Sequence, residues 1–187
     1  MMGLVYLAII LFIFFLIILF SFPQFSPIPY YPSNMKDKKL ILKALNMRND
    51  QIIIDLGAGD GAVVFEAAKV SKSQGLSTRF IALEINPVLI VILYFRWFFH
   101  PNKKQISIVW GDMFVIDYKK QISTDLARLK PIITFYLYIS PWLIEKAIKP
   151  IQKQIPACQL VSYYYPIKSL KQKEKMLAGI HNIYFYE

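Results

Sequence analysis

Cysteine and histidine are scarce in this chain of 187 residues, which has one cysteine, Cys158, and two histidines, His100 and His181. A single cysteine excludes a disulfide scaffold. The same count excludes a cysteine-based zinc site, and two histidines leave few ligands for any other transition metal, so we expect no metal site. Intrinsic disorder is also excluded, because aromatic and branched aliphatic residues are abundant throughout the chain.

Charged residues are missing from the first 35 positions. The first one is Lys36, so all 22 Lys and Arg and all 12 Asp and Glu, which together give a net charge of +10, lie in residues 36–187. The chain therefore consists of an uncharged apolar leader and a basic domain, which is long enough to bury one core. A basic surface of this kind is either a general property of the domain or faces an anionic membrane.

The leader contains 17 consecutive apolar residues, from 4 to 20. About 20 apolar residues match the hydrocarbon thickness of a bilayer, and the basic start and small-residue cleavage site of a signal peptide are missing. We therefore predict an uncleaved transmembrane anchor over residues 1–22. The first basic cluster, Lys36, Lys38 and Lys39, follows this span. It predicts a single-pass membrane protein with its domain on the cytoplasmic side, or on the matrix side in mitochondria.

Four prolines in residues 23–35 predict a stiff linker between the anchor and the domain. The domain, residues 36–187, then alternates between strand-like and helix-like patterns. This alternation predicts an α/β fold with a doubly wound, mostly parallel sheet. Strands are expected at residues 51–56, 80–83, 106–109, 132–138, 159–165 and 183–186. Helices are expected at residues 36–45, 61–69, 87–99 and 143–148, the last closed by Pro150.

The most informative stretch joins the first predicted strand to the following helix. The strand ends in Asp55, and a turn with Gly57, Gly59 and Gly61 comes next. Glycine lets a backbone turn sharply and approach a ligand closely, and the first amides of a helix are free donors. In open α/β sheets the ligand crevice lies outside the carboxyl ends of the strands. We therefore expect a cofactor at this turn, with Asp55 accepting hydrogen bonds from a cationic or amino group.

Two further acids follow the next two predicted strands. Glu84 is suited to accept both hydroxyls of a ribose, and Asp112 is suited to accept from an adenine amino group. Other interpretations stay open, because Glu84 precedes an ordinary helix start at Asn86 and Pro87 and Asp112 also fits a solvated loop. The same turn matches a dinucleotide-binding pattern too, so an NAD-dependent oxidoreductase remains an alternative, although such a first strand normally lacks an acid like Asp55.

The glycine turn and the three acids resemble those of the class I S-adenosylmethionine-dependent methyltransferases. The chain is also similar to one subfamily of this class. The similar features are the apolar leader, the Tyr-Tyr-Pro-Ser stretch at 30–33, the Leu-Glu-Ile-Asn-Pro stretch at 83–87 and Arg96. The subfamily consists of the small membrane-anchored protein-lysine methyltransferases that act on the ATP synthase c subunit and the adenine nucleotide translocase. The resemblance implies a Rossmann-like methyltransferase fold and S-adenosyl-L-methionine as cofactor. The implied cofactor-binding residues are Asp55, Gly57, Gly59, Asp60, Gly61, Glu84, Asn86 and Asp112.

The sequence also departs from the wider class. The Asn-Pro-Pro-Tyr tetrad of adenine and glutamine methyltransferases is absent after the fourth strand, so we expect no nucleic-acid partner. Only about 20 residues follow the fifth predicted strand, too few for the usual helix and two further full strands, which implies a shortened C-terminus.

The leading prediction is methyl transfer to a lysine of a membrane protein. A lipid or small molecule is an alternative acceptor, because anchoring explains either. An apolar, aromatic channel would lower the pKa of a lysine amine. Tyr31, Tyr138 and Trp142 are candidates to line it, with Asp60 orienting the amine, and the sequence assigns no catalytic residue.

Overall fold

The computed structural model describes the backbone of residues 2–21, 31–128 and 130–187, and their side chains except those of residues 18–21, 124, 127 and 128. Most of the predicted linker, residues 23–30, lies outside the described residues. The predicted domain begins with a short 3-10 helix, η1 (Met35–Asp37), and is built around one sheet.

The sheet has seven strands in the order β3-β2-β1-β4-β5-β7-β6. Their bounds are β1 (Gln51–Leu56), β2 (Arg79–Glu84), β3 (Ile106–Trp110), β4 (Ile132–Leu137), β5 (Gln159–Tyr163), β6 (Glu174–Leu177) and β7 (Ile183–Tyr186). Neighbouring strands from β3 to β5 pair in parallel, whereas β7 pairs antiparallel with both β5 and β6. Every residue of β1 is buried, as expected for a strand covered on both faces. The predicted doubly wound, mostly parallel sheet is confirmed.

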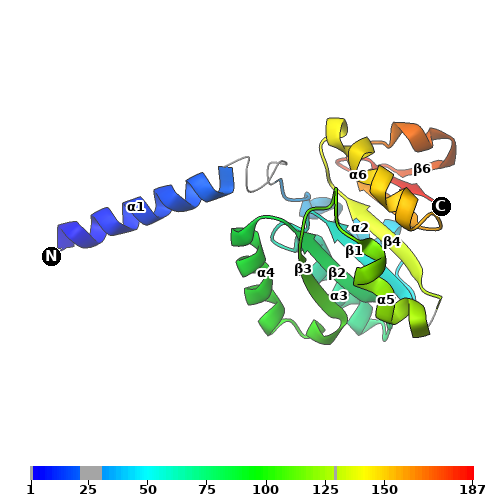
Figure 1. The fold of residues 1–187 in the computed structure, drawn as a ribbon, viewed down its shortest axis with the longest axis horizontal. Coiled ribbons are helices and arrows are strands. Elements are labelled where there is room, and N and C mark those ends of the chain that lie inside the picture. The colour runs from blue at the N-terminus through cyan, green and yellow to red at the C-terminus, as the bar shows by residue number, and fades with distance from the viewer. Residues whose placement is uncertain (1, 22–30, 129) are drawn as a thin grey trace.

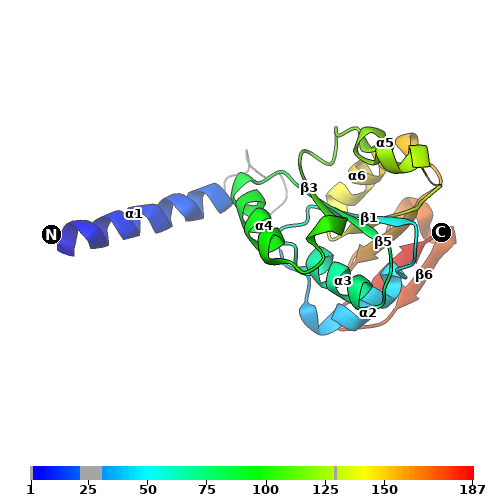
Figure 2. The same ribbon diagram turned by 90° about the horizontal axis from the view of Figure 1, so that it is seen from below.

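Helices cover both faces of the sheet (Figures 1 and 2). α2 (Lys38–Leu45), α3 (Ala62–Ser73) and α4 (Pro87–Phe99) share one buried cluster with Ile53 and Phe80. α5 (Tyr118–Arg128) and α6 (Pro141–Gln154) share the cluster on the opposite face with Ile54 and Ile81. Successive residues of β1 and β2 thus pack into the clusters on opposite faces of the sheet, because side chains alternate along a strand.

Three details differ from the sequence-based prediction. α5 was not predicted, because among those of its residues whose side chains are described only Tyr118 and Ile122 are buried. β6 was not predicted, because its four residues lie at the sheet edge and none is buried. The C-terminus therefore holds two short strands, with the 3-10 helix η3 (Lys168–Lys173) before them. α6 runs past Pro150, since Ile151 continues the buried stripe of Ile148.

The apolar leader forms helix α1 (Met2–Ser21). Its described side chains are apolar on every side and nearly all exposed, and the helix extends away from the sheet (Figure 1). Among the described residues, none of the helices combines the length and the apolar character that crossing a membrane requires. The predicted transmembrane anchor over residues 1–22 is thus not confirmed.

Candidate functional site

Backbone hydrogen bonds tie the carboxyl ends of β1, β2 and β3 together. The N–H of Gly57 donates to the carbonyl of Leu83 at 2.9 Å, and the N–H of Gly111 donates to the carbonyl of Glu84 at 3.0 Å. These strands are also adjacent in the sheet. The three strand-end acids predicted from the sequence therefore lie along one edge of the sheet: Asp55, Glu84 and Asp112.

The turn after β1 depends on glycine. Gly57, Gly59 and Gly61 all have positive φ, between 60° and 79°, a region that other residues seldom adopt. At Gly61 a Cβ would also lie 2.4 Å from the ring of Phe65. Glycine here lets α3 begin directly against the turn, with its first amides facing the sheet edge.

Glu84 joins the turn after β1 to the turn after β2. Its Oε2 accepts from the N–H of Gly59, and its Oε1 accepts from the N–H groups of Ile85 and Asn86, each at 2.8 Å. An ionised carboxylate has about four lone-pair sites, so one remains on Oε2. The sequence predicted two ribose hydroxyls as partners of Glu84, and the structure adds a second role, which is to hold both turns in place.

Asp55 is buried at the end of β1, beside Tyr136 in the register of β1 and β4. The pKa of Asp55 is raised to about 8, mainly by burial and also by the charges of Glu84 and Asp60, while the N–H of Val64 opposes the rise. A group that carries positive charge would stabilise the ionised form of Asp55. This position is therefore suited to a cationic or amino ligand.

Asp60 is paired with Arg96 of α4. The guanidinium donates to Oδ2 of Asp60 at 2.7 Å and to its backbone carbonyl at 2.6 Å, and it lies over the Phe65 ring, 5.1 Å from the centroid. Oδ1 of Asp60 accepts from the N–H of Ala62 in the first turn of α3. Asp60 therefore fixes the glycine turn against α4. Its predicted role in orienting an acceptor amine stays a prediction.

The other two predicted residues make local contacts. Asn86 is buried and caps α4, where its Oδ1 accepts from the N–H of Val88 at 2.9 Å. Asp112 is half-buried, and its Oδ1 accepts from the N–H of Phe114 at 2.8 Å. Both lie at the sheet edge that carries Glu84, and both shape the loops around it.

Two of the three predicted substrate residues line a pocket with the glycine turn. Tyr31 and Tyr138 surround it together with Asp55, Asp60 and the intervening glycines. Tyr138 also packs edge-on against Tyr163, with 5.0 Å between the ring centroids. The pocket is therefore acidic on one side and aromatic on the other. Trp142, the third candidate, is not among these lining residues and is 76% exposed.

The structure adds two residues to this wall that the sequence did not single out. The buried hydroxyl of Tyr136 hydrogen-bonds to Oγ of Ser33 at 2.8 Å, across 103 positions of sequence. Burial raises the pKa of Tyr136 well above its ordinary value, so the hydroxyl stays neutral. The spacing of Tyr136 and Tyr138 offered a signal, because alternate residues of a strand face the same side.

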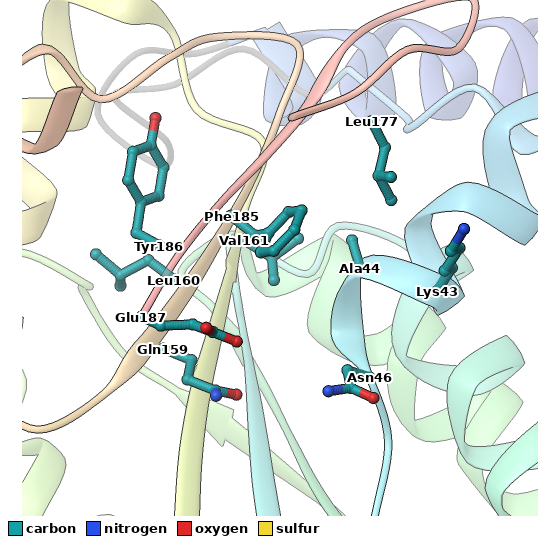
Figure 3. Close-up of a pocket in the computed structure, with 10 residues that line it drawn as sticks. All are labelled: Lys43, Ala44, Asn46, Gln159, Leu160, Val161, Leu177, Phe185, Tyr186 and Glu187. Carbon is teal, nitrogen blue, oxygen red and sulfur yellow. The ribbon is translucent and has the colours of Figure 1, made fainter. Parts of the chain in front are cut away.

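A second pocket lies at the opposite, amino edge of the parallel strands (Figure 3). It is lined by residues such as Lys43, Gln159 and Glu187, and none of the predicted site residues belongs to it. Within the described part of the chain, no three His, Cys, Asp or Glu side chains form a group suited to a metal ion.

Comparisons with known proteins agree with this arrangement. A protein-lysine N-methyltransferase of Saccharolobus islandicus is 27% identical over 168 residues, which cover 85% of this chain and 92% of that protein. A lysine N-methyltransferase of the ATP synthase C subunit, from Xenopus laevis, is 24% identical over 165 residues, which cover 86% of this chain and 63% of that longer protein. No protein-family model matches the sequence.

Solved structures show the same architecture. An RNA methyltransferase of Salinibacter ruber, in complex with S-adenosyl-L-homocysteine, superposes with a TM-score of 0.65 at 20% identity, over 83% of this chain and 92% of that one. The fold is that of a class I S-adenosylmethionine-dependent methyltransferase. The predicted resemblance and the predicted enzyme class are confirmed at this level. A methyltransferase of Geobacter sulfurreducens, similar at a TM-score of 0.52 and 11% identity over 83% of this chain and 60% of that one, was also solved with S-adenosyl-L-homocysteine. These complexes support the predicted cofactor.

Proposed function

We propose that this chain is a membrane-anchored methyltransferase that uses S-adenosyl-L-methionine and methylates a lysine of a membrane protein. The observation that carries the proposal is the pocket in which Asp55 and the glycine turn face Tyr31 and Tyr138. The names of the two lysine methyltransferase relatives support a protein substrate.

The residues at the strand ends fit the cofactor chemically. Asp55 offers a buried carboxyl group to a cationic or amino group, and Glu84 keeps one acceptor site for a hydroxyl. The glycine turn would let an adenosine approach the backbone closely. When bound, S-adenosyl-L-methionine supplies a methyl group that its sulfonium has already activated. The protein then has to align the acceptor with that group, so positioning contributes much of the rate.

The tyrosine wall fits a lysine acceptor. Tyr31, Tyr136 and Tyr138 line the pocket together with the glycine turn. Aromatic ring faces attract an ammonium group, and an apolar channel lowers the pKa of the amine that enters it. Loss of that proton to solvent would leave the amine neutral, with the lone pair that methyl transfer requires. Ser33 and Tyr136 fix one side of the wall by their hydrogen bond.

We propose α1 as the membrane anchor. In support, residues 4–20 are apolar without interruption, and the described α1 side chains are exposed on every side. A helix that is apolar all round needs an apolar environment. The lysines that follow, Lys36, Lys38 and Lys39, favour a domain on the cytoplasmic or matrix side.

Labelled methyl transfer tests this function. The purified full-length chain is incubated with membranes and S-adenosyl-L-methionine carrying a radiolabelled methyl group. The proposal predicts a labelled protein band in which the label lies on lysine, less label with Tyr31→Ala, and no change with the exposed edge variant Met176→Ala. Label in the lipid extract alone would favour the alternative acceptor class, and no label in any fraction contradicts the function.

A further inference from the structure

α4 carries a second unpartnered apolar surface, separate from α1. Its inner side packs into the core through Leu89, Ile90 and Leu93. Its outer side exposes five large apolar residues with helical spacing, and each is at least half exposed. Together with Trp110 they form the α4 stripe: Val91, Tyr94, Phe95, Phe98, Phe99 and Trp110.

Three phenylalanines of the stripe are in contact with one another. The rings of Phe95 and Phe99 meet edge-on with 5.3 Å between centroids, and those of Phe98 and Phe99 with 5.1 Å. Trp110, 68% exposed, donates from its indole N–H to the carbonyl of Ile85, which places it beside the start of α4. In the described part of the chain no other element covers these side chains, and exposed apolar patches of this kind mark interaction surfaces.

The charged residues of the segment that carries the stripe are all basic, and one of them, Arg96, is paired with Asp60. Residues 85–111 contain no Asp or Glu, whereas Arg96, Lys103 and Lys104 are basic. The ammonium group of Lys103 lies 5.0 Å from the centroid of Phe98 and 5.8 Å from that of Trp97. Aromatic residues beside lysines are typical of protein surfaces that lie at the headgroups of anionic membranes.

The position of α4 in the chain agrees with such a surface. Nine residues, 22–30, separate α1 from the described part of the domain, and a fully extended chain of that length spans about 30 Å. An anchored α1 therefore keeps the domain close to the bilayer. Figures 1 and 2 show α4 on the side of the domain toward α1.

We propose that the α4 stripe lies in the interface of an anionic lipid bilayer and docks the domain against the membrane. This inference rests on the proposed anchoring by α1 and deepens the proposed function. α4 begins directly after Glu84 and Asn86, and its Arg96 holds Asp60 of the glycine turn. Docking thus brings the methyl-transfer edge of the sheet to the lipid headgroups. The acceptors it selects are lysines of membrane proteins that emerge at the headgroup level.

Site-specific fluorescence tests the docking surface in the full-length chain. In a Cys158→Ser background, Val91→Cys on the stripe or Met176→Cys on β6, at the opposite edge of the sheet, is labelled with a dye whose emission rises in apolar surroundings. The protein is reconstituted into vesicles of phosphatidylcholine and phosphatidylglycerol. The proposal predicts a blue-shifted emission at position 91 that lipids brominated near the headgroup quench, and neither effect at position 176.

Three outcomes overturn the proposal. Equal quenching at both positions shows no preferred face, and no quenching at position 91 shows that lipid does not cover the stripe. A blue shift at position 91 that brominated lipids leave unchanged, and that grows with protein concentration, assigns the stripe to a second copy of the chain.

A charge variant gives an independent reading of the same surface. Phe95→Glu with Phe98→Glu should reduce methylation of membrane-embedded acceptors roughly tenfold, the effect of about 1.4 kcal/mol, and leave cofactor binding unchanged. Met176→Glu is the matched control and should change neither. Flotation with vesicles and cofactor binding are measured on the same variant. Loss of flotation rejects the proposed anchor, and loss of cofactor binding rejects the proposed enzyme. Normal flotation and normal cofactor binding with unchanged methylation reject only the docking role of the stripe.

Discussion

The turns after β1 and β2 both connect a strand to a helix, but they are built from different residues. Each follows a buried strand with an acid at its last or next-to-last residue, and each leads into a helix. The turn after β1 uses three glycines with positive φ, whereas the turn after β2 uses the Asn86 cap and Pro87. The acids differ as well, since Glu84 accepts three backbone N–H groups and Asp55 lies in surroundings that raise its pKa.

The difference separates two roles that the sequence presented as one. Glu84 is satisfied by the protein and ties the two turns together, so it shapes the site before a ligand arrives. Asp55 has its charge disfavoured by burial, and a cationic ligand would compensate for that. Glu84 therefore holds the two turns of the site in place, whereas Asp55 is suited to bind a positively charged group of the ligand.

The largest effect is expected from removal of the acid after β2. Glu84→Ala leaves the buried N–H groups of Gly59 and Asn86 without their acceptor, and each such group costs about 1–3 kcal/mol. We expect the free energy of unfolding to fall by roughly 2–6 kcal/mol and cofactor affinity to fall roughly 100-fold. Thermal unfolding in detergent and calorimetric titration measure the two. If the variant loses cofactor affinity and keeps its stability, Glu84 binds the ligand but does not hold the two turns in place.

The acid after β1 should respond to pH. The pKa of Asp55 is about 8 when folded, against an ordinary value of 3.8. Between these values the folded chain keeps a proton that the unfolded chain has lost. Stability therefore falls as pH rises through this window, by at most about 1.4 kcal/mol per unit. Asp55→Asn does not titrate, so its stability advantage should grow from about pH 4 to 8.

The same substitution should weaken the cofactor site. An ionised Asp55 favours a cationic ligand and an amide does not, so we expect roughly tenfold lower affinity for S-adenosyl-L-methionine near pH 8. Unfolding and titration are measured over the same pH range. Parallel stability curves for the two proteins would contradict the raised pKa of Asp55.

The glycines of the first turn predict a smaller effect. Gly61→Ala combines a φ of +79° with a Cβ 2.4 Å from the Phe65 ring, whereas Gly75→Ala, at φ +68°, meets nothing within 4 Å. We expect losses of about 2–4 kcal/mol at Gly61 and about 1 kcal/mol at Gly75. Thermal unfolding compares them, and equal losses would show that backbone strain alone sets the need for glycine.

The smallest effect is expected from Arg96, which connects the helix after β2 to the turn after β1. Arg96→Gln removes the pair with Asp60, in which both side chains are about a third exposed, so solvent screens it. We expect a loss of about 0.5–1 kcal/mol that shrinks at high salt. Arg96→Lys should recover part of it, because lysine keeps the positive charge but lacks the planar guanidinium that lies over Phe65. A loss that salt leaves unchanged would assign the effect to packing on Phe65.

The sequence predicted the features that depend on neighbouring residues. The strand that ends in Asp55, the glycine turn and the helix from Pro87 to Phe99 follow from local patterns, and the structure has them. Features that depend on distant partners were missed, such as the contact of Asp60 with Arg96, 36 positions away. The weak patterns of α5 and β6 also escaped, because few or none of their residues face a core.

The two pockets show the same limit. The sequence predicted the sheet edge that carries the acids, because the carboxyl ends of neighbouring parallel strands lie at the same edge of a sheet. Tyr31 and Tyr138 were candidates from the sequence, but the place of Tyr136 in the same wall required the fold, since Ser33 reaches Tyr136 across 103 positions. The pocket at the amino edge (Figure 3) joins residues such as Lys43 and Glu187, which no local pattern connects.

Calorimetric titration of the full-length chain with S-adenosyl-L-methionine, and separately with NAD, distinguishes a methyltransferase from an oxidoreductase. We expect one-to-one binding of S-adenosyl-L-methionine that strengthens as pH rises toward 8 and that Glu84→Ala weakens roughly 100-fold. We expect no binding of NAD. Binding of NAD without binding of S-adenosyl-L-methionine would contradict the methyltransferase function.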